Sequence, residues 1–298
     1  MVFGAGSLLA DDEKGGRRKD DEGRDDISVH EKNKAGVGRA PTAGGTAALS
    51  AIRNHGGPVM VTPVAYLIWY GNWNQTNASD TPAGQELVRT FLRGLGNSPY
   101  FNINKSYASS GNVILSSLEY TDPGSLGTTL SDSNVRTIVS NAINSGRLGA
   151  ADQTGVYFVL TSSNVNKSGF CSQYCGWHTY ATINRVAVKY SFVGNAQRCL
   201  SACAAQSVSP NGNPGVDGMI SVIAHELEET ASDPLLNAWY DASGNENADK
   251  CAWTFGSAQT RLPNGASYNM TVGGKNFLVQ RNLSAEDNKC YVEYHGRQ

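Results

Sequence analysis

One short stretch of the chain carries the residues best suited to chemistry, namely His225-Glu-Leu-Glu-Glu229. In an α-helix, residues four apart project from the same face one turn apart, so His225 and Glu229 would lie side by side. Both side chains bind zinc, and the pattern is that of the zinc-peptidase H-E-x-x-H helix with glutamate replacing the second histidine. The sequence therefore predicts a zincin-like site with His225 and Glu229 as metal ligands and Glu226 as the catalytic general base.

The third ligand of such a site must come from beyond the helix. The acidic stretch that follows supplies Asp241, Glu246 and Asp249. By residue type Glu246 is the better ligand, whereas by distance along the chain Asp249 fits the gluzincin-type peptidases better. We expect Glu246 to bind the metal and Asp249 to orient the imidazole of His225 by a hydrogen bond. Asp241 is the other alternative.

His178 is a second candidate catalytic residue. It could stabilise an oxyanion at the site or add a metal ligand, and ordinary packing beside Trp177 is the alternative. Zinc is the expected cofactor. Two carboxylates and one imidazole form a harder donor set than zinc peptidases usually carry, so calcium or manganese stays open as the alternative.

A plainer interpretation is that His225 and the glutamates form a solvated helix face with a hydrogen-bonded histidine. The preceding residues Met219, Ile220, Val222 and Ile223 are apolar around the whole helix, which indicates burial. Burying such side chains without a counter-ion would be costly. The sequence therefore favours a metal site over a solvated face.

Strands and helices alternate along the body of the chain. We expect strands over 63–70, 113–115, 156–160 and 186–190, helices over 82–95 and 131–148, and late strands over 277–280 and 291–294. This alternation predicts an α/β fold with a mixed central sheet, packed helices and a zincin-like, disulfide-stapled architecture. Residues 58–298 show no break in composition, so we expect 51–298 to form a single globular domain.

Residues 1–50 differ sharply from that body. Eight Lys or Arg and nine Asp or Glu lie between Asp11 and Arg39, with almost no aliphatic periodicity, so we expect a disordered charged segment. The apolar run over 1–10 is too short for a complete secretion signal. The net charge of −2 gives no reason to expect nucleic acid, and no apolar run approaches the roughly 20 residues of a membrane span.

The six cysteines all lie between 171 and 290 and include two C-x3-C pairs. We expect three disulfides, Cys171–Cys175, Cys199–Cys203 and Cys251–Cys290, and the alternative is a four-thiolate zinc site built from the two C-x3-C pairs. The candidate N-glycosylation sites are Asn74, Asn77, Asn104, Asn166, Asn269 and Asn282. Both features favour a secreted glycoprotein.

Several longer motifs resemble the plant phosphate-induced protein 1 (EXORDIUM-like) family. They are Ile68-Trp-Tyr-Gly-Asn-Trp73, Tyr174-Cys-Gly-Trp-His178, Gly215-Val-Asp-Gly-Met-Ile-Ser-Val-Ile-Ala-His-Glu226, Asp233-Pro-Leu-Leu-Asn-Ala-Trp-Tyr240 and Glu246-Asn-Ala-Asp-Lys-Cys251. The resemblance covers roughly 60–295. It implies a secreted cell-wall or apoplastic protein linked to growth and nutrient responses, without a settled biochemical activity. The chain departs from the family in its charged N-terminal segment and in a shortened stretch after Cys251.

Two functional hypotheses follow. The first is a secreted metal-dependent hydrolase, acting on a peptide or a cell-wall polymer in the extracellular space. The second is a non-catalytic extracellular binding protein, in which Trp69, Tyr70 and Trp73 could form a platform for sugars. Neither hypothesis involves nucleic acid or a membrane span, and both leave the oligomeric state open.

Overall fold

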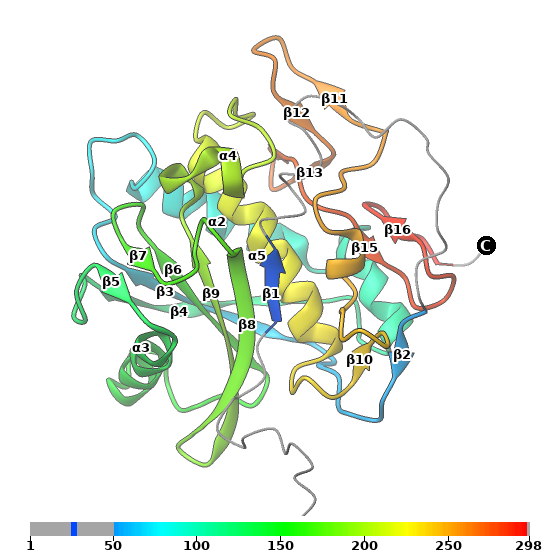
Figure 1. Cartoon of the computed structure of the whole chain (residues 1–298), viewed down its shortest axis with the longest axis horizontal. Coiled ribbons are helices and arrows are strands. Elements are labelled where there is room, and N and C mark those ends of the chain that lie inside the picture. Colours follow the sequence, from blue (N-terminus) through cyan, green and yellow to red (C-terminus); the bar gives the residue numbers. More distant parts are fainter. Residues whose placement is uncertain (1–24, 29–50, 297–298) are drawn as a thin grey trace, which may run out of the picture.

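A five-stranded mixed sheet lies at the centre of the computed structural model, which describes residues 25–28 and 51–296 (Figure 1). The strands follow the order β8-β9-β6-β3-β4, with bounds Tyr174–Ile183, Val186–Gly194, Gly155–Thr161, Val64–Tyr70 and Ile114–Asp122. The last four are mutually parallel, and β8 pairs antiparallel with β9. The predicted α/β fold with a mixed sheet and packed helices is therefore confirmed.

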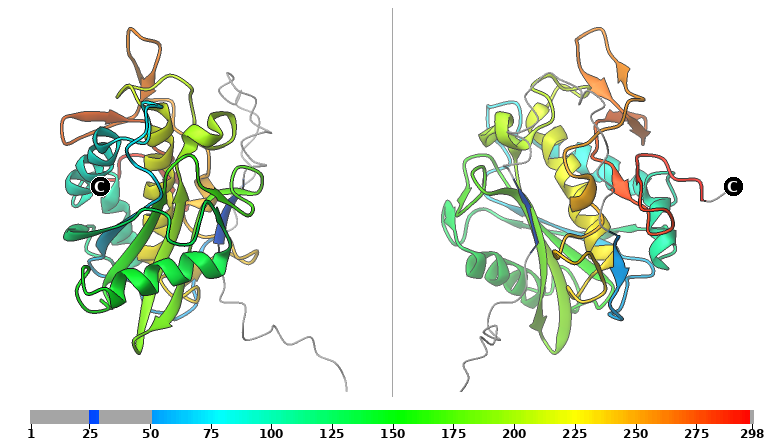
Figure 2. Two further views of the ribbon diagram at one scale, coloured as in Figure 1. Left: turned by 90° about the vertical axis from the view of Figure 1, so that its left-hand side faces the viewer. Right: turned by 45° about the vertical axis from the view of Figure 1, so that its right-hand side comes forward.

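The middle strands are apolar because both faces of the sheet are covered. Every residue of β6 is buried, and β3 is buried from Leu67 to Tyr70. Strands covered on two faces read as continuous apolar runs rather than as alternating ones. Helix α3 (Asp132–Asn144) packs on one face, and α2 (Pro82–Leu95) and α5 (Pro214–Ser232) lie on the other (Figure 2).

The helices predicted over 82–95 and 131–148 both form, each with a side-chain cap at its N-terminus, and the second ends at Asn144. Thr81 accepts a hydrogen bond from the Gly84 backbone N–H at the start of α2. Ser131 forms a capping box with Asn134 at the start of α3. Each cap satisfies backbone N–H groups that the first turn of a helix leaves without a partner.

The remaining elements are short. They are the 3-10 helices η1 (Phe101–Tyr107), η2 (Ala196–Arg198) and η3 (Asp249–Cys251), the helix α4 (Leu200–Cys203), and the strands β2 (Arg53–Asn54), β5 (Thr129–Leu130), β7 (Asn166–Lys167), β10 (Trp239–Tyr240), β11 (Thr260–Arg261), β12 (Ser267–Tyr268), β13 (Met270–Val272), β14 (Lys275–Phe277), β15 (Asn282–Leu283) and β16 (Cys290–Tyr291). The late strands β14 and β16 form two-stranded ribbons with β13 and β15 and do not join the central sheet.

A further strand, β1 (Asp25–Ser28), pairs antiparallel with the outer edge of β8. Its residue Asp25 is opposite His178, and Ser28 is opposite Tyr174. Apart from β1, the charged segment 1–50 that we predict to be disordered lies outside the described residues. Within the described residues, no helix is long and apolar enough to span a membrane.

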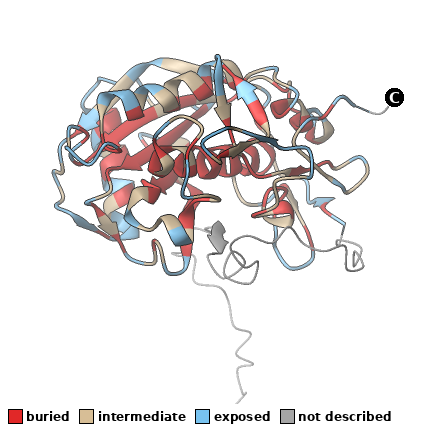
Figure 3. Cartoon of the chain, turned by 90° about the horizontal axis from the view of Figure 1, so that it is seen from above, coloured by how far each residue is buried: buried red, intermediate tan, exposed pale blue. Residues whose placement is uncertain are grey.

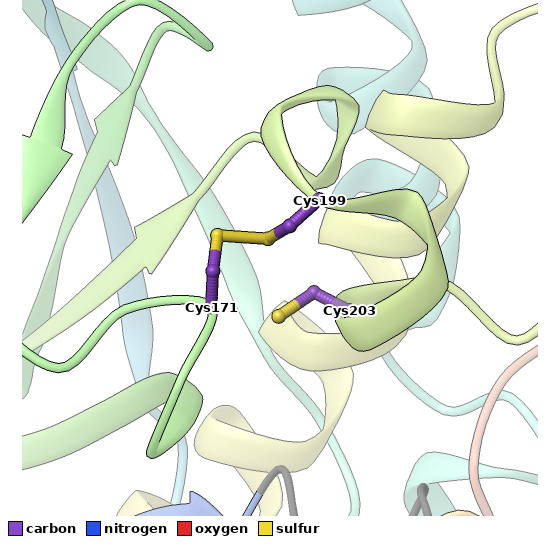
Figure 4. Close-up of side chains that lie close together, drawn as sticks. All are labelled: Cys171, Cys199 and Cys203. Carbon is purple, nitrogen blue, oxygen red and sulfur yellow. A yellow bond between two sulfur atoms is a disulfide. The ribbon is translucent and has the colours of Figure 1, made fainter.

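The disulfide pairing differs from the prediction in two of three bonds. Cys251–Cys290 forms as expected, but the other bonds are Cys171–Cys199 and Cys175–Cys203, so the predicted Cys171–Cys175 and Cys199–Cys203 are wrong. Figure 4 shows the Cys171–Cys199 bond with Cys203 beside it.

The fold explains this crossed pairing. Cys199 directly precedes α4 and Cys203 ends it, about one turn apart, and both bond to the segment that carries Cys171 and Cys175. The bonded Cα atoms are 5.9 and 5.4 Å apart, within the usual range for disulfides. No cysteine is free, which excludes the four-thiolate zinc site.

Candidate metal centre

Helix α5 carries the predicted pentapeptide through the middle of the molecule (Figure 3). The helix begins at Pro214, whose preceding residue Asn213 accepts a hydrogen bond from the Val216 N–H. From Val216 to Ser232 only Asp217 is not buried. A helix that is buried all round must bring its polar residues into contact with other polar groups. The solvated helix face considered above is therefore wrong.

Strand β8 brings His178 against this helix. Gly176 and His178 are two apart on the strand, so they point to the same face. A Cβ at Gly176 would lie 2.5 Å from Val222 and 3.0 Å from Glu226 Oε1, so only glycine permits this close approach of strand and helix. The glycine thus places the imidazole of His178 beside the glutamates of α5.

Three predicted residues meet at one end of the cluster. His225 Nε2 lies 2.8 Å from Glu229 Oε1 and 3.5 Å from Asp249 Oδ1. The Asp249 backbone N–H donates to Glu229 Oε1 at 2.9 Å, which fastens η3 to the helix. One donor atom from each residue lies within 4.8 Å of the others, as in a group that could hold a metal ion.

A second group lies beside the first and shares Glu229. His178 Nε2 is 3.4 Å from Glu246 Oε2, and His178 Nδ1 is 3.6 Å from Glu229 Oε2. His178, Glu229 and Glu246 also offer donor atoms within 4.8 Å of one another. Glu226 flanks this group, because its Oε2 forms a 3.3 Å hydrogen bond with His178 Nδ1. The residues that we predicted from sequence therefore meet in one place.

The structure divides these residues differently from the sequence analysis. Asp249, which we expected to orient His225, groups with His225 and Glu229 as a possible ligand. Glu246, the expected third ligand, groups instead with His178 and Glu229. Asp241 lies outside both groups, since it pairs with Lys250 Nζ at 2.7 Å and accepts backbone N–H groups of its own loop.

The histidine nitrogens of the cluster are not satisfied by ordinary hydrogen bonds. Within the described part of the chain, neither ring nitrogen of His225 has a hydrogen-bond partner, and neither has His178 Nε2. His225 Nε2 is nevertheless 2.8 Å from Glu229 Oε1, so the two atoms are close without being aligned as donor and acceptor. Buried polar atoms without partners are rare, and a bound water or ion is one common explanation for them.

Burial and mutual charge shift the pKa values of the whole cluster. Burial would lower the pKa of His178, but the hydrogen bond to Glu226 and the negative charge of Glu229 raise it to about 10. Burial would likewise lower the pKa of His225, but Glu229 and Asp249 hold it well above its usual value. Burial would raise the pKa of Glu229, but the two histidines lower it to about 2, whereas burial raises that of Glu226 to about 8.

Glu228 lies on the same helix but serves a different purpose. Its Oε2 accepts hydrogen bonds from the side-chain amides of Asn104 (2.5 Å) and Asn282 (2.6 Å). These bonds join α5 to η1 and β15. Burial raises the pKa of Glu228 well above its usual value. No pattern in the sequence distinguishes this structural glutamate from Glu226 and Glu229.

The same contacts exclude two glycosylation candidates. Asn104 and Asn282 are fully buried with their amides bonded to Glu228, so a glycan cannot be attached in the folded protein. Asn74 and Asn77 are exposed, and Asn166 and Asn269 are partly buried.

The aromatic platform considered for sugars is also excluded, because Trp69, Tyr70 and Trp73 are buried in the core. Trp69 donates its indole N–H to Glu119, and Trp73 donates to the Leu160 carbonyl. The rings at the end of β3 are therefore used for packing.

Comparison with known proteins gives one family. The sequence model of the phosphate-induced protein 1 conserved region matches residues 52–293. The chain is 32% identical to Protein EXORDIUM-like 5 of Arabidopsis thaliana over 282 residues, covering 79% of this chain and 76% of the relative. It is 29% identical to Protein EXORDIUM-like 3 of the same plant (79% and 81% covered) and 25% identical to Protein PHOSPHATE-INDUCED 1 of Nicotiana tabacum (75% and 82%). No solved structure gives a significant match.

Proposed function

This chain belongs to the phosphate-induced protein 1 family, and on that premise we propose that it is a secreted metalloprotein whose helix α5 binds a divalent cation. His225, Glu229 and Asp249 would hold the ion. One observation carries the proposal: a fully buried imidazole without hydrogen-bond partners lies next to two carboxylates of different elements.

The distances fit such a site. Ligand atoms about 2.0–2.2 Å from a tetrahedral ion are about 3.3–3.6 Å from one another. His225 Nε2 and Asp249 Oδ1 are 3.5 Å apart, within this range. His225 Nε2 and Glu229 Oε1 are closer at 2.8 Å, a separation that a small side-chain shift would correct when an ion binds.

We propose zinc as the cation. An imidazole and two carboxylates are accepted zinc ligands, and three protein ligands leave a fourth position for water. Manganese and calcium are the alternatives, since two oxygen donors also suit harder ions. When bound, such an ion would hold together α5 and the segment after β10 and could activate a water molecule.

Secretion is supported by the cysteines. All six form disulfides, and two of these bonds cross-link the β8 and α4 segments over a separation of 28 residues. Such bonds form and persist in oxidising compartments and are rare in the cytosol. The proposed location is therefore the extracellular space or the cell wall.

Hydrolysis of a peptide is the second candidate function. Glu226 follows a proposed ligand directly, and its Oε1 has no hydrogen-bond partner among the described residues, as a general base would require. Strand β1 shows that an extended backbone can pair with the β8 edge at His178, which is how a peptide substrate would approach. The side chains of both histidines and of Glu226 are fully buried, so a substrate needs this edge to open.

The proposed metal binding is tested by elemental analysis of the secreted protein, purified without chelator. We expect about one or more zinc ions per chain in the wild type, and a clear loss in His225→Ala. The matched control is Glu228→Gln, which changes a buried glutamate of the same helix that lies outside the cluster. Wild type without metal, or equal metal in wild type and His225→Ala, would refute the proposal.

Catalysis is tested separately with a library of unstructured peptides. If the protein is a peptidase, the metal-loaded chain lacking residues 1–28 cleaves them and its Glu226→Gln variant does not, although both carry the same metal. If the metal-loaded protein cleaves none of the peptides, the remaining hypothesis is a non-catalytic extracellular binding protein.

A further inference from the structure

We propose that the cluster binds two divalent cations rather than one, with Glu229 bridging them. The second ion would be held by His178, Glu229 and Glu246, beside the first at His225, Glu229 and Asp249. This inference rests on the proposed function, because the first cation is the one proposed above.

The carboxylate of Glu229 presents its two oxygens to two different histidines. Oε1 lies 2.8 Å from His225 Nε2, whereas Oε2 lies 3.6 Å from His178 Nδ1. A site for one metal ion at His225 would need only one oxygen of Glu229 as a ligand, and the other oxygen would not have to face a second histidine. One donor atom each of His178, Glu229 and Glu246 lies within 4.8 Å of the others, so Oε2 needs only a small turn from Nδ1 toward an ion at His178 Nε2 for the carboxylate to bridge two ions about 3.5–4 Å apart.

Glu226 prepares His178 to act as a ligand. Its Oε2 forms a 3.3 Å hydrogen bond with Nδ1, which places the ring proton on that nitrogen when the carboxylate is charged. The lone pair of His178 is then on Nε2, which has no hydrogen-bond partner within the described residues although the side chain is fully buried. A carboxylate that holds a histidine in this way is typical of zinc sites.

The second ligand pair has the separation that a bound ion requires. His178 Nε2 and Glu246 Oε2 are 3.4 Å apart. This value lies within the range of about 3.3–3.6 Å for two ligands of a tetrahedral zinc ion. His225 Nε2 and Asp249 Oδ1, in the first group, are 3.5 Å apart. The histidine and the acid that each group does not share with the other therefore lie at nearly the same separation in both groups.

The formal charges also favour two ions. The cluster combines four carboxylates, from Glu226, Glu229, Glu246 and Asp249, with two imidazoles. When both imidazoles act as ligands and all four carboxylates are ionised, two divalent cations balance the four negative charges, whereas one cation leaves two that protons on His178 and Glu226 would have to offset. Uncompensated buried charge is strongly unfavourable.

The experiment is a zinc titration of chelator-treated, full-length protein, followed by removal of unbound zinc and elemental analysis. We expect two zinc ions per chain in the wild type, one in Glu246→Gln, one in Asp249→Asn, and two in the control Glu228→Gln. X-ray absorption at the zinc edge should show a zinc–zinc distance of about 3.5–4 Å in the wild type only. Far-ultraviolet circular dichroism establishes that each variant is folded.

The outcomes separate the two proposals. One zinc ion in the wild type that survives Glu246→Gln and is lost in Asp249→Asn would overturn the second site and leave the first. Two ions without a zinc–zinc distance would overturn the bridging role of Glu229. No zinc in the wild type would refute both proposals.

Discussion

Asp249 donates its backbone N–H to Oε1 of Glu229 at 2.9 Å, across twenty residues of sequence. This bond places the Asp249 carboxylate beside His225 and thereby joins a short 3-10 helix to the central helix. The path of the chain between them is held by Asp241, which pairs with Lys250 at 2.7 Å. Asp249 is thus positioned by its own backbone bond to Glu229 and by an ion pair, Asp241–Lys250, that lies outside the cluster.

The crossed disulfides give the first prediction. In the chain-entropy model, a bond that closes 28 residues stabilises the fold by about 3.6 kcal/mol. Because Cys175–Cys203 already closes nearly the same loop, replacing Cys171 and Cys199 together by serine should lower the free energy of unfolding by less than this, roughly 2–3 kcal/mol, measured by urea denaturation.

The pairing itself is read from a non-reducing digest of the denatured protein. Cleavage after Tyr174 and Leu200 separates the members of each C-x3-C pair. Masses that join the peptides of Cys171 with Cys199 and of Cys175 with Cys203 are expected. Masses that join Cys171 with Cys175 would contradict the structure.

Glu228 gives a prediction about stability without metal. Glu228→Ala leaves the buried amides of Asn104 and Asn282 without their acceptor. Each unsatisfied buried donor costs about 1–3 kcal/mol, so we expect a loss of roughly 3 kcal/mol in chemical denaturation. Glu228→Gln keeps an acceptor oxygen and should cost much less. Equal losses in the two variants, or loss of metal in either, would contradict the structural role of this side chain.

The pKa shifts predict how the stability of the metal-free protein depends on pH. The pKa of His178 rises from 6.5 to about 10 on folding, so its contribution is present below pH 6.5 and is lost as pH rises through about 10. Glu226, raised from 4.5 to about 8, acts in the same direction. Glu229, lowered to about 2, loses its contribution only as pH falls from 4.5 toward 2.

The measurement is the Tm of chelator-treated protein between pH 6 and 9, which should fall as pH rises. Zinc-loaded protein should show a flatter profile, because the cation replaces the protons of the imidazoles. A Tm of the chelated protein that rises over this range would show that the histidines are neutral in the folded state.

Strand β1 gives a prediction about access to the site. Because β1 pairs with β8 opposite His178, deleting residues 1–28 should expose the edge of β8. We expect faster hydrogen exchange over Tyr174–His178 and faster removal of metal by a chelator. Deleting residues 1–20 is the matched control, since it leaves β1 in place. Identical rates in the two truncated chains would mean that β1 does not cover the site.

Many of the helices and strands could be predicted from the sequence, because capping residues and runs of apolar residues determine them locally. Thr81 with Pro82 and Ser131 with Asn134 mark helix starts by capping, and the apolar run before His225 indicates a buried helix. Strand β8 could not be found in this way. Its ten residues mix aromatic and polar types, and only the packing of α5 against Gly176 buries His178.

The sequence could not predict which acid lies beside His225 and which beside His178, because this too depends on tertiary contacts. Whether Asp249 or Glu246 reaches His225 depends on a turn that the Asp241–Lys250 pair and the bond to Glu229 determine. The pairing of four neighbouring cysteines likewise depends on which elements face each other, and spacing alone allows several solutions.

The central claim is that His225, Glu229 and Asp249 hold a cation, and anomalous diffraction from a zinc-soaked crystal tests it most directly. Data collected above and below the zinc edge should give a peak within about 2.0–2.2 Å of His225 Nε2, Glu229 Oε1 and Asp249 Oδ1. A well-ordered site without an anomalous peak, in which the His225 ring donates directly to Glu229 or Asp249, would contradict the account.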